Sequence, residues 1–255
     1  MEKKILYLLT CVGLCWSSCT NEVDEFIGNV EPSTRSVSTA LNANLASLFT
    51  GGAPTLTSAE IKEVNDAYAK MTSINCYRNI DEAVRNKTSY AGTIFLDDTY
   101  ASAYFRKGSL AFPPYGILAS SMEHEFIHMY QRDVQGKKVD TDKEKRDTGM
   151  MEFELAFYQG IIRYIHAGYS WTFKGEDGDP SYQSLWTSGL TDPSLIPQYE
   201  REFQTYVASI CANGKPTSID INEFVKWSNI FGEYSRGYSG KGYKFGNYDY
   251  GTSCN

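Results

Sequence analysis

Hydrophobic residues recur at helical spacing along most of this chain, and the pattern predicts a mainly α-helical fold. The first such stretch follows residues 57–60, whose sequence Thr-Ser-Ala-Glu resembles a capping box, a common start of a helix. Further helices are expected at about residues 117–132, 148–167, 194–212 and 219–234. The apolar positions of the first stretch lie three or four residues apart: Ile61, Val64, Tyr68 and Met71.

Two stretches are rich in aromatic and β-branched residues and predict β-strands. They cover residues 92–97 and 101–112, with a short polar turn between them and a Pro-Pro pair after the second. Both precede the predicted helix at residues 117–132. The expected fold is therefore α+β, a mainly helical domain with a small antiparallel sheet beside that helix.

Composition narrows the class of protein. A chain of 255 residues with 42% hydrophobic and 22% charged residues has the make-up of a soluble globular protein that buries one core. The formal net charge is −7, so no basic surface is expected to neutralise phosphates. This argues against nucleic acid as a partner.

The N-terminus carries a short basic and apolar leader segment. Two lysines precede an apolar run at residues 5–16, which is shorter than the roughly 20 residues that span a bilayer. Ser17, Ser18 and Cys19 follow, and with them the segment resembles a bacterial lipoprotein signal, in which the cysteine is lipidated. The resemblance implies a signal peptide at residues 1–18. The alternative is a plain secretory signal with a chance cysteine.

The expected organisation follows from this signal. Residues 19–35 are a polar, acidic tether, and residues 36–255 form the folded domain. The protein is expected in the bacterial cell envelope, on the periplasmic or surface-facing side of the outer membrane, with only the lipid touching the membrane. Removal of the signal peptide and lipidation of Cys19 would leave three cysteines, enough for one disulfide. A Cys211–Cys254 pair would hold down the C-terminal tail.

The strongest chemical pattern is His124-Glu125-Phe126-Ile127-His128, an HExxH motif that holds two of the chain's three histidines. Residues four apart share one face of a helix, so both imidazoles can reach one metal ion. Glu125 is rotated about 100° from its neighbour and can reach a metal-bound water, where it would act as general base. The alternative is a chance match on a buried helix, but Glu123 and Glu125 would be unusual residues there.

A catalytic zinc needs a third protein ligand. The pattern HExxHxxGxxH fails here, because Gln131 and Val134 stand at the last two defined positions. Glu152 and Glu154 are better candidates, and with them the chain resembles the gluzincin type of zincin metallopeptidase, in which a glutamate on a later helix completes the site. His166 lies 14 residues after Glu152, about 21 Å along a helix, which is too far to share the ion.

The two glutamates are separated by about 200° around the predicted helix, so only one can face the ion. Glu154 projects from the apolar stripe and needs a partner, which a metal could be. Glu152 shares its side with Ala156 and Gly160, small residues that would let the motif helix approach closely. We choose Glu152 as the third ligand, and expect Glu154 to make hydrogen bonds in the core or behind the site.

The resemblance implies zinc-dependent hydrolysis of a peptide or protein substrate, with Zn²⁺ held by His124, His128 and Glu152. The residues from 103 to 112 would pair with extended substrate or form an ordinary edge strand. A rival hypothesis is a non-catalytic lipoprotein that binds a peptide or glycan on a zincin scaffold; the retained Glu125 favours the enzyme. A tyrosine is expected to stabilise the oxyanion, and three candidates are not distinguished by the sequence: Tyr234, Tyr238 and Tyr243.

Overall fold

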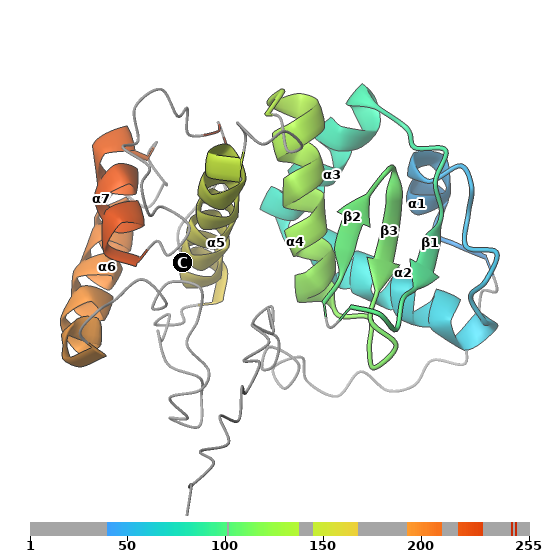
Figure 1. Ribbon diagram of the computed structural model, residues 1–255, viewed down its shortest axis with the longest axis horizontal. Helices are drawn as coiled ribbons and strands as arrows, with labels where there is room; N and C mark the ends of the chain where they lie inside the picture. The colour runs from blue at the N-terminus through green and yellow to red at the C-terminus, as the bar shows by residue number, and fades with distance from the viewer. Residues whose placement is uncertain are drawn as a thin grey trace, which may run out of the picture.

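The computed structural model describes residues 40–100, 102–137, 145–167, 193–210, 219–231, 246 and 248. These residues form a mainly helical fold with one small sheet (Figure 1). In chain order the elements are α1 (Ala43–Leu48), α2 (Ser58–Ser73), α3 (Asn75–Lys87), β1 (Ile94–Leu96), β2 (Tyr104–Arg106), β3 (Ser109–Phe112), α4 (Ala119–Met129), the π-helical turn η1 (Tyr130–Val134), α5 (Lys145–Ala167), η2 (Pro193–Leu195), α6 (Ile196–Ile210) and α7 (Ile221–Phe231).

The five predicted helices are all present. The capping box before α2 is formed: the Thr57 side chain accepts from the backbone N–H of Glu60 at 3.3 Å, and the Glu60 carboxylate accepts from the backbone N–H of Thr57 at 2.6 Å. The predicted helices at residues 117–132 and 148–167 left residues 133–147 between them as a connection, and the helical structure extends into this stretch from both sides. Its first two residues belong to η1, and its last three belong to α5.

Two helices were not predicted from the sequence. The α1 helix has six residues, which is too short to show a hydrophobic period. The α3 helix does carry the signal, because Cys76, Ile80 and Val84 lie four residues apart and are all buried. The N-cap residue of α3 is Ile74, whose side chain makes no capping hydrogen bond. No helix-start signal in the sequence therefore accompanies the periodicity.

The sheet corrects two expectations. Residues 101–112 were predicted as one strand, but the chain turns back at Lys107 and Gly108 and forms the β2–β3 hairpin. Both turn residues have positive φ angles, 51° and 78°, the combination that suits a two-residue hairpin. The expected purely antiparallel sheet is also wrong: the strand order is β1-β3-β2, and β1 pairs with β3 in parallel. The extra reversal at the hairpin gives β3 the direction of β1.

The sheet and the helices share a continuous apolar core. The α4 helix contacts α2 and α3 on one side and α5 on the other, and it lies between the sheet and α5 in Figure 1. Beyond α5, an aromatic cluster joins α5 to α6 and α7, with ring centroids of neighbouring members 5.2 to 6.0 Å apart. Its members are Phe153, Phe157, Phe203, Phe224 and Trp227, all buried.

The α4 helix does not stop at Met129 but widens into η1. The backbone N–H of Gln135 bonds to the carbonyl of Tyr130, five residues earlier, and Gly136 ends the turn with a φ of 71°.

None of the helices in the described part of the chain has the length and apolar character of a membrane span.

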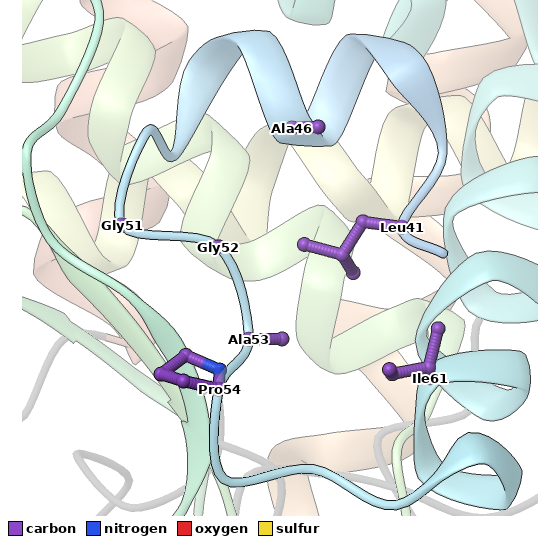
Figure 2. A pocket seen from close by; sticks show the side chains of 7 residues that line it. All are labelled: Leu41, Ala46, Gly51, Gly52, Ala53, Pro54 and Ile61. Carbon is purple, nitrogen blue, oxygen red and sulfur yellow. The ribbon is translucent and has the colours of Figure 1, made fainter. Parts of the chain in front are cut away.

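An open apolar hollow lies between α1, the turn after it and the start of α2 (Figure 2). Its lining residues are Leu41, Ala46, Gly51, Gly52, Ala53, Pro54 and Ile61. None of them belongs to the HExxH motif or to α5. The hollow is therefore separate from the chemistry expected at the motif.

Candidate metal centre

The two motif histidines project from the same side of α4. Their rings are 4.7 Å apart between centroids, and their Nε2 atoms are 3.1 Å apart. Phe126 and Ile127, which lie between the two histidines in the sequence, are buried on the core side of α4. The imidazoles therefore project toward α5 rather than into the core. About a fifth of each side chain is exposed, so an ion could enter from solvent.

Glu152 on α5 meets both histidines. One carboxylate oxygen lies 3.1 Å from His128 Nε2, and the other lies 3.5 Å from His124 Nε2. One ligand atom from each of the three residues lies within 4.8 Å of the other two. A tetrahedral zinc site with bonds of 2.0–2.1 Å would hold its ligand atoms about 3.4 Å apart. The three residues therefore fit the ion without a large rearrangement.

Glu125 lies beside the histidines and has an exposed fraction of 4%. Burial, together with the charge of Glu152, raises the pKa of Glu125 to about 8, although His128 and a backbone hydrogen bond act in the opposite direction. That hydrogen bond comes from the N–H of Phe105. The carboxylate is thus held next to the site by the sheet.

The register of the hairpin explains why Phe105 is available to Glu125. The pair that closes the two-residue turn, Arg106 with Ser109, exchanges backbone hydrogen bonds, so the next pair, Phe105 with Leu110, does not. The N–H of Phe105 consequently points away from β3. Because β2 is an edge strand that contacts α4, this N–H faces the motif helix.

In the metal-free protein, His128 and Glu152 each stabilise the charged form of the other. Burial alone would lower the pKa of His128, but the charge and hydrogen bond of Glu152 raise it well above its usual range. Burial alone would raise the pKa of Glu152, but the charge and hydrogen bond of His128 lower it. A bound cation would take the place of the proton on His128.

Gln131 contacts His128 from behind. It is fully buried, and its Oε1 lies 3.0 Å from His128 Nδ1. Its amide nitrogen donates to the backbone carbonyl of Met151 at 3.0 Å. In the sequence, Gln131 stood out only as a mismatch to the pattern HExxHxxGxxH. Its position three residues after His128, on nearly the same helix face, is the signal that could have found it.

Glu154 faces away from the histidines, into the core. Its carboxylate is fully buried and accepts from the Lys137 ammonium, from the Tyr248 hydroxyl at 2.6 Å and from the backbone N–H of Gly246 at 3.2 Å. The sequence argument that a buried glutamate needs a partner was correct, but the partners are these groups. The structure therefore places Glu152, and not Glu154, with the two histidines.

Other predicted residues fall outside the described part of the chain. They include the signal peptide, the tether, Cys19 and the Cys211–Cys254 pair, as well as the three tyrosines considered for the oxyanion. The same is true of the side chain of His166, although its backbone belongs to α5. Gly160, one of the small residues expected to let α4 and α5 approach each other, is buried.

No protein-family model, curated protein or solved structure matches this chain. The residues of the candidate centre are therefore the only indication of function in the described part of the chain.

Proposed function

We propose that the protein is a zincin-like metallopeptidase, a zinc-dependent hydrolase of peptide bonds. The observation that carries this proposal is the convergence of His124, His128 and Glu152, from two separate helices, at separations that suit one tetrahedral ion. Three protein ligands leave one position open, which is typical of catalytic rather than structural zinc. Glu125, which is next to the ligands without being one, supports the same class.

The roles of the residues follow from their positions. A zinc ion in such a site acts as a Lewis acid and makes water a stronger nucleophile near neutral pH. The charge of a bound cation would favour the ionised form of Glu125. In that form Glu125 would accept a proton from the attacking water and return it to the amine that leaves when the peptide bond breaks. The hydrogen bond from Phe105 fixes the carboxylate beside the ligands during these transfers.

The sequence supports a place for this activity in the cell. The apolar run at residues 5–16 and the following Ser-Ser-Cys favour a lipid on Cys19 and an anchored enzyme in the bacterial envelope. Cys19→Ser should leave the protein unprocessed or release it from the membrane fraction. If wild-type protein expressed in a bacterial host carried no lipid on Cys19, that result would contradict the proposed anchor.

The activity is tested with Glu125→Gln, and Glu123→Gln on the same helix is the matched control. Both variants should keep zinc, because neither side chain is a proposed ligand. Glu125→Gln should lose peptide hydrolysis by about 10²- to 10⁴-fold, the usual contribution of a general base, whereas Glu123→Gln should keep it. Zinc-loaded wild type that cleaves nothing in a broad peptide library would instead support the non-catalytic binding protein.

A further inference from the structure

The Gln131 side chain connects both helices of the metal centre. It lies on the π-helical turn directly after α4, and it bonds to His128 on α4 and to the carbonyl of Met151 on α5. Met151 directly precedes Glu152 in the chain. One buried amide therefore joins the second motif histidine to the residue next to the third candidate ligand.

The bond to Met151 determines which nitrogen of His128 keeps its proton when the ring is neutral, as it would be as a metal ligand. A backbone carbonyl only accepts hydrogen bonds, so the NH₂ end of Gln131 must face Met151. The oxygen end then faces His128, and an oxygen of this kind also only accepts. His128 must therefore carry a hydrogen on Nδ1, which reserves Nε2 for the side where His124 and Glu152 lie.

The same amide holds α5 in place. The Met151 carbonyl has two lone pairs, so it can accept from Gln131 as well as within its own helix. A rotation of α5 that moved Glu152 away from His128 would also break the bond to Gln131. Because both the amide and Met151 are buried, water could not easily replace that bond.

These two bonds explain why an amide stands at this position. A carboxylate, a common partner of metal-binding histidines, could accept from His128 but could not donate to the carbonyl of Met151. A glutamine does both with one side chain. Its position three residues after His128 brings it to the same face of the helix.

We propose that Gln131 is a positioning residue that prepares both halves of the site, by fixing the tautomer of His128 and the placement of Glu152. This inference rests on the proposed zinc site. It adds that the site is set before the ion arrives.

Two substitutions at Gln131 separate the two bonds. Gln131→Met removes both bonds with little change of size, while Gln131→Glu keeps an acceptor for His128 and loses the donor to Met151. Gln135→Met is the matched control. The Gln135 side chain ends the same turn, and its buried amide has no hydrogen-bond partner among the described residues.

Zinc affinity is measured by competition with a chelating dye. Gln131→Met should weaken binding by about 10- to 100-fold, as is usual when the hydrogen-bond partner of a ligand is lost. Gln131→Glu should weaken it less, and Gln135→Met should leave it unchanged. In the zinc-loaded protein, the imidazole ¹⁵N spectrum of His128 should show a protonated Nδ1 in the wild type and in Gln131→Glu.

Hydrogen exchange of the metal-free protein tests the second bond without any zinc. Backbone amides around Met151 should exchange faster in Gln131→Met and in Gln131→Glu than in Gln135→Met. Equal exchange in the three variants, or equal zinc affinity of Gln131→Met and Gln135→Met, would overturn the positioning role. If the wild type binds no zinc, the proposed function fails, and the exchange comparison alone decides whether Gln131 holds α5.

Discussion

Glu152 and Glu154 stand two positions apart on α5, yet they lie in opposite surroundings. The Glu152 side chain is about one-fifth exposed, and its carboxylate faces two imidazoles. The Glu154 carboxylate is fully buried and faces a lysine, a tyrosine hydroxyl and a backbone N–H. Helix geometry alone separates them, because a shift of two residues turns a side chain by about 200°.

The partners of each glutamate decide what it can do. Imidazoles can give up a proton and bind a metal together with a carboxylate, so the group around Glu152 can exchange protons for an ion. Lys137 supplies the opposite charge to Glu154, and further donors satisfy its oxygens. That cluster holds the C-terminal residues Gly246 and Tyr248 against α5, which is a task of folding stability.

The largest expected effect separates the two glutamates by zinc binding. Glu152→Gln removes a charged ligand, so zinc affinity should fall by more than about 100-fold, beyond the range expected for residues behind the ligands. The measurement is a zinc titration against a competing chelator. Unchanged affinity in Glu152→Gln, with a loss in Glu154→Gln, would reverse the assignment of the two residues.

The complementary substitution should act on stability instead. Glu154→Gln removes the charge that faces Lys137 inside the core, and the free energy of unfolding should fall by about 1–3 kcal/mol. Denaturant unfolding of the metal-free protein measures this loss. Zinc affinity, determined on the folded variant, should stay at the wild-type value.

A smaller effect should come from the tyrosine that contacts Glu154. Tyr248→Phe removes the hydroxyl at 2.6 Å but keeps the ring, whose centroid lies 4.4 Å from that of Tyr158. The free energy of unfolding should fall by about 1–2 kcal/mol, since one hydrogen bond is lost while Lys137 and the N–H of Gly246 still satisfy the carboxylate. A change in zinc affinity in this variant would show that the two carboxylate environments are coupled.

The smallest effect calibrates the others at a distance from α5. Thr57→Ala removes the N-cap of α2, and the free energy of unfolding should fall by about 1 kcal/mol. Zinc affinity should be unaffected, because α2 contributes no residue to the centre. If this variant lowered zinc affinity as much as Glu152→Gln, affinity would be following general stability rather than ligand identity.

Local patterns were sufficient to predict which side chains of the candidate metal centre face one another. The spacing of His124 and His128 gives their common face, and the small Gly160 on α5 indicated the side on which α4 could approach. The partners that come from distant parts of the chain had no such signal. Lys137 and Tyr248 are 17 and 94 positions from Glu154, and nothing in a local pattern pairs them.

The sheet was predicted less well than the helices for a similar reason. Helical periodicity extends over many residues, whereas each strand has three or four residues and its direction depends on turns. The Lys107-Gly108 turn lies inside the stretch that was predicted as one strand, and its two positive φ angles reverse the chain there. The edge position of β2, and with it the bond from Phe105 to Glu125, follows from that reversal.

The zinc content of the purified protein tests the central claim most directly. After zinc supplementation and removal of loosely bound metal, elemental analysis should find about one zinc per wild-type chain, as a three-ligand site holds one ion. His124→Ala and His128→Ala should each reduce it to background, and Glu154→Gln should retain it. A zinc content near zero in folded wild-type protein would contradict the metal centre and the peptidase proposed from it.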